Sequence, residues 1–585
     1  MAKEFSDIAK VISVSPNQIE IEIFDPDSYE SLTPKILIGS YIKISDDHKL
    51  ALIAIVQSFR IKDIVTQDQT EESKRPRFII DCQQVGSFSE GKFRRGGQQI
   101  AIPPTKVEQA TQSDLESIYQ GIKDEKRFSF GTLSQNDKIQ VIVDGDKFFG
   151  KHIGVVGSTG SGKSCTVAKI LQEGINSSAD QKKRGILNNS HIIIFDLHGE
   201  YKSAFPKANI ISIDNLKLPY WLMNSEELEE LFIESQEQNS HNQISQFKAA
   251  VIKNKEKHNS SLKVDYDTPA YFSLKEVHQY IKNQNLATVN YSTHKLEIID
   301  RDESVADEYI LFEENISFVE TKAKTVKTGA FFGEFDRFIS RIEGKLNDER
   351  LEFLLKPRKK DKSEYTSSDL LEIIEQFIGY SADKSNITII DLGGIPFEVL
   401  SIVVSLITRL IFTFSFYLKK NKLNKDEIPF LLVYEEAHNY IPQNDTAKYK
   451  TVKKSIERIA KEGRKYGISL MIVSQRPSEI SDTIFSQCNN FVAMRLTNPT
   501  DQQYIKRLLP DSISAITDSL PVLEKQEAII IGDSIQIPSI IEVDDISEKP
   551  NSQDINFQTE WKKDWVEGQF DNLVKDWTKT KKGNA

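Results

Sequence analysis

The octapeptide at 157–164 constrains the fold of this chain more than any other segment. It reads Gly-Ser-Thr-Gly-Ser-Gly-Lys-Ser and satisfies the pattern GxxxxGK(S/T) in full. An apolar run at 153–156 precedes it and a helix-like segment at 165–176 follows it, which is the context that a phosphate-binding loop requires. The sequence therefore predicts a nucleoside triphosphate site between a strand and a helix.

Each residue type in this loop has a physical role. Gly157, Gly160 and Gly162 let the backbone turn its N–H groups toward the phosphates, and the following helix presents its positive end to them. Lys163 is expected to reach the terminal phosphates, and the Ser164 hydroxyl to complete a Mg²⁺ shell. ATP and Mg²⁺ are therefore the expected cofactors, and the expected contacts are Gly157, Ser158, Thr159, Gly160, Ser161, Gly162, Lys163, Ser164 and Cys165.

A second apolar run ends in two adjacent carboxylates. Residues 430–434 have the composition of a central parallel strand, and Glu435 and Glu436 follow it. We expect Glu435 to hold the metal through water, and Glu436 to orient the water that attacks the γ-phosphate. Glu435 stands where most such sites have Asp, and its longer side chain shifts the oxygen. The alternative interpretation is a pair of solvated glutamates at the start of a helix.

Two other apolar strands also end in polar residues. Asp196 and Glu200 follow one of them, at the carboxyl edge where ligands bind in open α/β sheets. Gln475 follows another, where an amide is suited to sensing the γ-phosphate. The alternative for Gln475 is that it caps a turn before Pro477.

A strongly basic segment lies between the two glutamates and Gln475. Arg464 is suited to act as an arginine finger in a neighbour's ATP site. The lysines, together with Tyr449, are suited to a pore that grips a nucleic-acid backbone, but they also fit a solvated helix face. The basic residues are Lys448, Lys450, Lys453, Lys454, Arg458, Lys461, Arg464 and Lys465.

The order of strands and helices predicts the fold class. Strands expected at 153–156, 192–196, 387–391, 430–435, 469–474 and 491–494 alternate with helical patterns around one phosphate loop. This order predicts an α/β fold, with a RecA-like P-loop ATPase core built on a doubly wound parallel sheet. We expect an N-terminal β-barrel at 1–140, core segments at 141–214 and 385–545, a helical insertion at 215–384 and a tryptophan-bearing tail at 546–585.

Composition excludes several function classes. The net charge of −11 argues against an outer surface that coats nucleic acid, although it allows a basic channel. Three distant cysteines and the absence of a signal peptide at the start favour a cytoplasmic protein. The apolar stretch at 397–418 contains Glu398 and Arg409, so we expect a core helix and no membrane span.

Together these motifs resemble the HerA-type hexameric ATPases, relatives of the FtsK-like DNA pumps. The resemblance implies a homohexameric ring with ATP sites between subunits and duplex DNA in its centre. It also implies that Arg464, helped by Lys151, reaches the neighbouring site. Tyr434 and Glu435 depart from the family, which more often has an apolar residue and Asp. The resemblance rests on HIGVVGSTGSGKS at 152–164, FDLHGEY at 195–201, VYEEAHNYIP at 433–442, EGRKYG at 462–467, SQRP at 474–477, the N-terminal barrel and a closing segment at 528–543.

Two functions follow from this resemblance. The first is an ATP-driven DNA translocase or helicase that works with a separate effector, because the chain has no nuclease or NADase constellation of its own. Similar bacterial proteins pair with a nuclease or a sirtuin-type NADase in antiviral defence, and a composition rich in Lys, Asn and Ile suggests a bacterial source. The alternative is an ATP-dependent scaffold that organises an effector. A DEAH-box-like helicase is disfavoured, since such enzymes need two tandem lobes and the chain has one phosphate loop.

Overall fold

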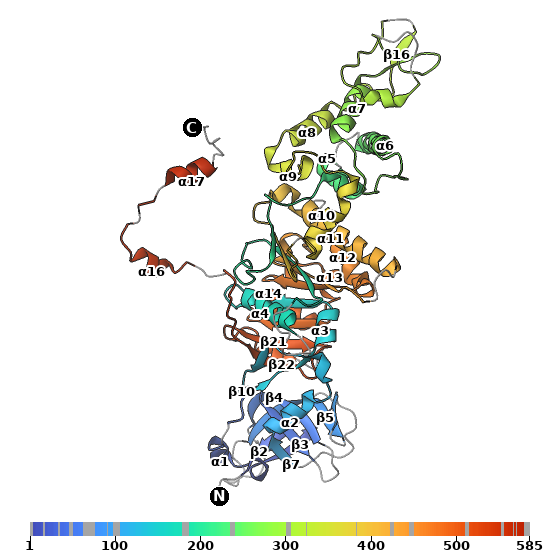
Figure 1. The fold of residues 1–585 in the computed structure, drawn as a ribbon. Helices are drawn as coiled ribbons and strands as arrows, with labels where there is room; N and C mark the ends of the chain where they lie inside the picture. Colours follow the sequence, from blue (N-terminus) through green and yellow to red (C-terminus); the bar gives the residue numbers. More distant parts are fainter. Residues whose placement is uncertain are drawn as a thin grey trace.

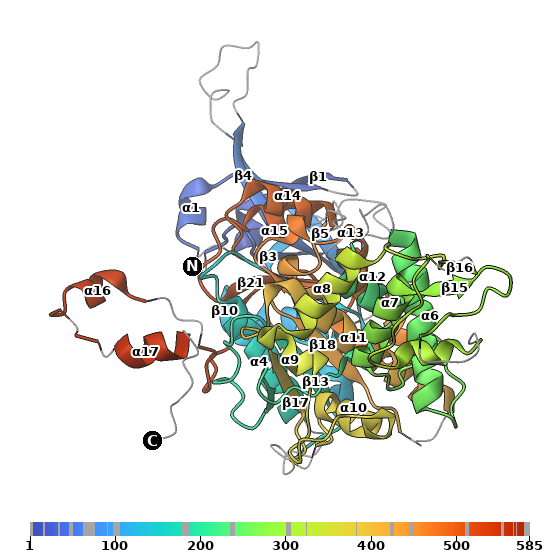
Figure 2. The same ribbon diagram turned by 90° about the horizontal axis from the view of Figure 1, so that it is seen from above.

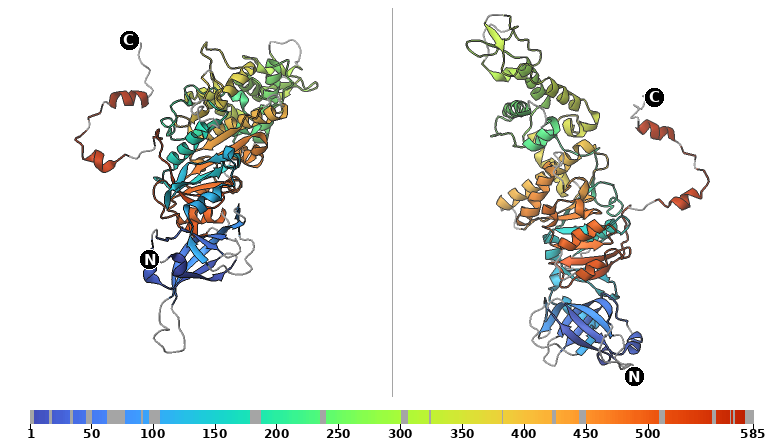
Figure 3. Two further views of the ribbon diagram at one scale, coloured as in Figure 1. Left: turned by 60° about the horizontal axis from the view of Figure 1, so that its bottom comes forward. Right: turned by 180° about the vertical axis from the view of Figure 1, so that it is seen from behind.

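The protein is elongated, with an N-terminal sheet at one end, a larger sheet in the middle and a helical region at the other end (Figure 1). Figure 3 shows the same order from behind and from below. The computed structural model describes residues 4–15, 18–32, 35–45, 51–62, 77–89, 92–96, 106–177, 187–234, 240–299, 306–322, 325–381, 383–421, 426–443, 450–508, 514–551, 555–565, 567–568 and 570–577.

The N-terminal region is an antiparallel sheet with its own apolar core. In β2 (Ile19–Ile23) the isoleucines are buried and the glutamates half-buried, which is the period-two pattern of a strand with one face inward. The strand order is β1-β2-β5-β4-β3-β7, with β6 paired to β5. Its other elements are β1 (Ala9–Val14), α1 (Pro26–Glu30), β3 (Tyr41–Ser45), β4 (Ala51–Lys62), β5 (Arg77–Ser89), β6 (Lys92–Arg95), β7 (Lys106–Gln109) and α2 (Gln112–Tyr119).

This sheet supports the predicted N-terminal β-barrel in part. Within the described residues no ladder joins the edge strands β1 and β7. The sheet is therefore a half-barrel. The sequence indicated the strands correctly because their alternation is local, whereas closure depends on pairing between strands far apart in the chain.

The central sheet has eleven strands in the order β10-β9-β22-β21-β20-β12-β19-β18-β13-β17-β14. The pairs from β20 to β14 are all parallel, and the strands from β20 to β17 are largely buried and apolar. The strands are β9 (Gly131–Leu133), β10 (Asn136–Gln140), β12 (Ile153–Val156), β13 (His191–Asp196), β14 (Asn209–Ile211), β17 (Ile387–Asp391), β18 (Phe430–Tyr434), β19 (Ile468–Ser474), β20 (Asn490–Met494), β21 (Glu527–Gly532) and β22 (Ser539–Val543).

The sheet is mixed, whereas the sequence predicted a parallel one. β21, β22, β9 and β10 extend it by antiparallel pairing beyond β20. Residues 533–538 are too few for the crossover that a parallel neighbour of β21 needs, so β22 turns back beside it. The surrounding elements are β8 (Arg127–Phe128), β11 (Val143–Asp144), α3 (Gly145–Gly150), α4 (Lys163–Asn176), α11 (Phe397–Asn421), α12 (Lys450–Glu462), α13 (Asp482–Phe485), α14 (Pro499–Leu508) and α15 (Ser514–Asp518).

A helical region separates β14 from β17 along the chain and projects beyond the sheet (Figures 1 and 2). Its core is continuous with that of the central sheet. Its elements are α5 (Ser225–Phe232), α6 (Ser240–His258), α7 (Leu274–Leu286), β15 (Thr288–Asn290), β16 (Val326–Thr328), α8 (Asp336–Leu346), α9 (Glu352–Leu355) and α10 (Leu370–Ile378).

Helix α11 is long and apolar enough to cross a membrane by length and composition alone. However, 78% of its most apolar window is buried inside the fold. Arg409 on this helix forms an ion pair with the buried Glu227 on α5, at 2.7 Å. The helix thus lies where the sequence placed it, in the core between the sheet and the helical region.

The end of the chain follows the nucleotide-binding helix and then leaves the body. Lys169 Nζ and Gln172 Nε2 on α4 donate to the carbonyl oxygens of Asp545 and Glu548, at 3.3 and 3.0 Å. Beyond this strap, at 544–551, α16 (Phe557–Trp561) and α17 (Phe570–Trp577) stand apart from the body in Figures 1 to 3.

Candidate nucleotide site

The phosphate loop turns sharply between β12 and α4. Gly160 and Gly162 have φ angles of 75° and 101°, a region that residues with a side chain rarely adopt. A Cβ added at Gly157 would lie 2.6 Å from the Ser161 hydroxyl oxygen. The loop is tied to the end of β20, because the Ser158 N–H donates to the carbonyl oxygen of residue 495 at 2.7 Å. These constraints explain the three glycines.

The interior of this loop offers polar groups to an anion. The first helical hydrogen bond is the one from the Thr166 N–H to Gly162, so the N–H groups before it, at the start of α4, have no partner within the helix. The Ser161 hydroxyl is fully buried and makes no hydrogen bond with the described part of the chain. Lys163 is also buried, and Cys165 lies half-buried in the first helical turn. The loop therefore fits a phosphate chain.

Two side chains from other strand ends contact this loop. The Ser164 hydroxyl donates to Glu200 Oε2 at 2.7 Å. The Thr159 hydroxyl donates to Gln475 Oε1 at 2.6 Å. The structure thus brings Glu200 and Gln475, which were predicted from separate strands, into direct contact with the phosphate loop.

Asp196 has a different environment. Its carboxylate accepts hydrogen bonds from the backbone N–H groups of Gly199, Glu200 and Tyr201, at 2.9, 3.2 and 3.0 Å. It is fully buried, and this burial raises its pKa. Asp196 therefore holds the turn that carries Glu200.

Glu435 is almost completely buried at the end of β18. Burial, followed by repulsion from Glu436, raises the pKa of Glu435 to about 8. One oxygen accepts a hydrogen bond from the Tyr201 hydroxyl at 2.8 Å, and the charge of Lys163 opposes the rise. Burial thus favours the protonated form of this carboxyl.

Glu436 has a strained backbone and an unpaired oxygen. Its φ and ψ are both 46°, the left-handed region that costs a residue with a side chain of order 1 kcal/mol or more. Its Oε2 is buried and makes no hydrogen bond with the described chain, although the His438 Nδ1 lies 3.3 Å away. The His438 Nδ1 is also 3.2 Å from the Ser474 hydroxyl oxygen. This geometry leaves Glu436 able to accept a hydrogen bond from a water molecule.

The polar side chains around the phosphate loop fit a Mg²⁺ ion that is held mainly by the ATP phosphates and by water. The described residues contain no cluster of three or more His, Cys, Asp or Glu side chains that could hold a metal by themselves. Mg²⁺ commonly keeps several waters and binds through the nucleotide phosphates and one or two protein groups. Ser164 fits that role, and Glu200 contacts its hydroxyl directly.

Tyr201 and His438 contact the two glutamates, but the sequence did not single them out. Tyr201 lies 234 positions before Glu435, and an ordinary tyrosine after a turn carries no signal of such a contact. The only hint in the sequence is that Tyr201 and His438 each lie within two residues of a candidate carboxylate, Glu200 or Glu436.

Lys151 and Arg464 lie at the opposite, amino-terminal edge of the same sheet. Lys151 directly precedes β12, and its Nζ pairs with Asp533 Oδ2 at 2.6 Å. Arg464 lies in the 3₁₀ turn before β19, and its Nη1 donates to Asn489 Oδ1 at 3.4 Å. Because β12 has four residues and spans roughly 13 Å, these cations are separated from the phosphate loop of their own chain.

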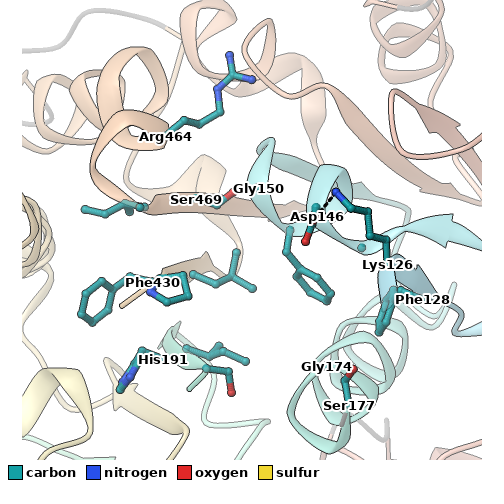
Figure 4. Close-up of a pocket in the computed structure, with 18 of the residues that line it drawn as sticks. Lys126, Phe128, Asp146, Gly150, Gly174, Ser177, His191, Phe430, Arg464 and Ser469 are labelled. Carbon is teal, nitrogen blue, oxygen red and sulfur yellow. Dashed lines mark ion pairs between the residues drawn. The ribbon is translucent and has the colours of Figure 1, made fainter. Parts of the chain in front are cut away.

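A cavity of about 430 Å³ lies at this amino-terminal edge. Its lining includes His191 and Phe430, at the starts of β13 and β18 (Figure 4). Lys126 and Asp146, which form an ion pair in Figure 4, also line it, as does Arg464, which extends away from that pair. The cavity is therefore separate from the phosphate loop.

Several basic side chains of α12 form ion pairs or ring contacts within the same chain. Lys454 pairs with Glu226 at 2.5 Å, and Lys461 with Glu457 at 3.6 Å. Arg458 lies over the ring of an α11 phenylalanine, 4.5 Å from its centroid. These contacts favour the solvated helix face over the pore for these three residues. Lys448, from the predicted basic set, and Tyr449 lie outside the described residues.

Known proteins resemble this chain along most of its length. Residues 128–411 match the family model described as Helicase HerA, central domain. The chain is 26% identical over 571 residues to the DNA double-strand break repair helicase HerA of Sulfolobus acidocaldarius, covering 95% of this chain and 93% of that protein. The protein of the same name from Sulfurisphaera tokodaii is also 26% identical, over 91% of this chain and 93% of its own length.

Among solved structures, VirB4 of Thermoanaerobacter pseudethanolicus aligns with a TM-score of 0.44 and 14% identity, over 73% of this chain and 98% of that one. The family model spans the phosphate loop, and the sequence relatives extend over nearly the whole chain. The chain is therefore similar to HerA helicases along nearly its whole length, and it is an ATP-hydrolysing enzyme.

Proposed function

We propose that this protein is a DNA translocase or helicase whose copies form a ring of six around duplex DNA, powered by ATP and Mg²⁺. The proposal is supported by the likeness to proteins named DNA double-strand break repair helicase. In this proposal the enzyme acts in the cytoplasm with a separate effector, a nuclease or a sirtuin-type NADase, in antiviral defence or DNA processing.

The position of the cations on the sheet carries this proposal. The phosphate loop follows the carboxyl end of β12, whereas Lys151 precedes its amino end and Arg464 precedes β19. A neighbour related by rotation could place its amino-terminal edge against the phosphate loop of the next copy. Such a head-to-tail contact forms a closed ring when the rotation closes. Arg464, helped by Lys151, would then stabilise charge on the neighbour's phosphates.

Within one site, the side chains have distinct proposed roles. Lys163 and the N–H groups of the loop bind and orient the phosphates, and Gln475 reports their state through its contact with Thr159. Glu436 accepts a hydrogen bond from the attacking water at its unpaired oxygen. Mg²⁺, when bound at Ser164, would neutralise charge on the phosphates.

The test mixes two inactive variants. Lys163→Ala removes ATP binding from a subunit's own loop, and Arg464→Ala removes the group offered to its neighbour. We expect each variant alone to turn over ATP at least about 100-fold more slowly than wild type. A mixture should regain turnover, because a Lys163→Ala subunit can still offer its arginine to a neighbour with an intact loop. Absence of any recovery in mixed assemblies, verified by native mass, contradicts the arrangement.

A second candidate function is an ATP-dependent scaffold for an effector. It is favoured by the strap, because the Asn551 N–H donates to the Glu200 carbonyl oxygen at 2.9 Å, and Glu200 contacts the phosphate loop. The tail beyond the strap exposes Trp561, Trp565 and Trp577. A partner bound by the tail would thus be connected to the nucleotide site through the strap. Duplex DNA distinguishes the functions: it stimulates the ATP turnover of a motor, whereas the turnover of a scaffold changes only when its partner binds.

A further inference from the structure

Two turns lie against the amino-terminal edge of the central sheet, beside Lys151 and Arg464. One turn, at 488–490, runs into the first residue of β20, and the other, at 532–534, begins at the last residue of β21. The turns are hydrogen-bonded to each other, because the N–H of residue 533 donates to the carbonyl oxygen of residue 489 at 3.1 Å. Gly532 has φ of 145°, and a Cβ there would lie 2.3 Å from that same carbonyl oxygen. Glycine at 532 therefore allows the close contact.

Each turn offers one side chain to one cation. Asp533 accepts the Lys151 ammonium at 2.6 Å, and the Asn489 amide oxygen accepts the Arg464 guanidinium at 3.4 Å. Arg95, from the N-terminal sheet, donates to the carbonyl oxygen of residue 532 at 3.0 Å and so gives the second turn a further contact. The side chains of Lys151 and Asp533 remain 33% and 50% exposed, so a second anion can still approach the ammonium.

Buried polar groups hold the backbone around both cations. The Asn490 Nδ2 donates to the carbonyl oxygen of Lys151 at 2.9 Å. The buried His152 accepts the Leu470 N–H at its Nδ1 and donates from its Nε2 to the Ala460 carbonyl oxygen, both at 3.0 Å. Burial lowers the pKa of this imidazole to about 4, which keeps it neutral for both contacts. One side chain thus fixes the two ends of the segment that carries the arginine.

We infer that Asp533 is a positioning residue for Lys151, and that the two turns set Lys151 and Arg464 in place for the phosphates bound by a neighbouring copy. An ammonium has three donors, and the pair with Asp533 uses one of them. A lysine that is already held loses less side-chain freedom when it meets a phosphate than a mobile lysine does. This inference rests on the proposed head-to-tail ring.

Asp533→Asn tests it, because asparagine keeps the shape of the side chain and removes its charge. Exposed ion pairs are worth up to about 1 kcal/mol, so we expect kcat/KM for ATP to fall about two- to five-fold. The matched control is Glu372→Gln in the helical region. Glu372 pairs with Lys217 at 2.6 Å, and those side chains are 54% and 35% exposed. The control should leave kcat/KM unchanged, and both variants should keep the wild-type unfolding midpoint in urea.

A double-mutant cycle with Lys151→Ala shows whether Asp533 acts through the lysine. We expect Lys151→Ala to lower kcat/KM, and Asp533→Asn to have no further effect in that background. An equal effect of Asp533→Asn with and without Lys151 overturns the inference. If Lys151→Ala lowers kcat/KM and Asp533→Asn does not, the inference is wrong while the proposed ring stands. If neither Lys151→Ala nor Arg464→Ala changes turnover, both the ring arrangement and the inference are wrong.

Discussion

Glu436 combines a strained backbone with a buried oxygen that has no hydrogen-bond partner in the described chain. A residue that served only to fill the core would not require either feature, and such strain concentrates at functional sites. We expect Glu436→Gln to lower ATP turnover by about 10²- to 10⁴-fold, because a general base contributes on that order. ATP binding, measured with a fluorescent analogue, should remain within a few-fold of wild type.

Glu479→Gln is the control, since Glu479 is half exposed and pairs with Arg476 at the surface. Turnover near the wild-type value in Glu436→Gln would remove the proposed base role.

The raised pKa of Glu435 predicts that the stability of the fold depends on pH. Its pKa is about 8 in the fold against 4.5 for an ordinary glutamate, so between these values the folded chain binds a proton that the unfolded chain lacks. Stability therefore falls as pH rises from about 4.5 to 8. Glu435→Gln cannot lose a proton and still accepts the Tyr201 hydroxyl hydrogen bond.

We expect Glu435→Gln to be more stable than wild type at pH 8.5, by on the order of a few kcal/mol, and similar to wild type near pH 4.5. Urea unfolding at several pH values measures the difference. A constant difference between the two proteins across this range would show that Glu435 does not carry the raised pKa.

At the scale of elements, α5 and α11 are joined by a buried ion pair. Glu227 is fully buried, and its carboxylate accepts hydrogen bonds from two nitrogens of Arg409. It also accepts a hydrogen bond from the Asn224 N–H and so caps the start of α5. Arg409→Leu leaves this carboxylate without its cation, so we expect a loss of about 3–5 kcal/mol in the free energy of unfolding.

Adding Glu227→Gln to Arg409→Leu should recover more than half of this loss, because glutamine keeps the cap and carries no charge. Urea unfolding of the single and double variants measures both values. If the double variant is as unstable as the single one, the cost lies in lost packing of the arginine stem and not in the unpaired charge.

The sequence predicted elements better than it predicted their assembly. β12, β13 and β18 were recognisable because each is a continuous apolar run that ends in polar residues. The three-residue β14 is too short to show a period, and the antiparallel extension depends on pairing that brings β9 beside β22, far apart in the chain. The same limit applies to the site. Ser164 and Glu200 both follow strands whose carboxyl ends lie at the same edge of the sheet, so their proximity could be expected. The contact of Tyr201 with Glu435 could not be expected from the sequence.

At the scale of the whole molecule, the two edges of the central sheet have complementary functions in the proposed ring. The carboxyl edge holds the phosphate loop, and the amino edge holds Lys151 and Arg464. A single copy therefore has both halves of a site but cannot bring them together across its own sheet. Turnover should depend on assembly, so ATP hydrolysis per subunit should fall as the protein is diluted below the concentration at which native mass shows dissociation.

DNA dependence separates the motor from the scaffold at this scale. The formal net charge is −11, so attraction to DNA must come from a local surface and should weaken steeply with salt. For a motor, we expect a native mass near six subunits and ATP turnover that duplex DNA stimulates several-fold at low salt, with the stimulation lost at high salt. Lys163→Ala should keep the mass and lose the turnover. A six-subunit assembly whose turnover ignores DNA but changes when its partner protein binds would contradict translocation, because only the scaffold couples ATP hydrolysis to the partner alone.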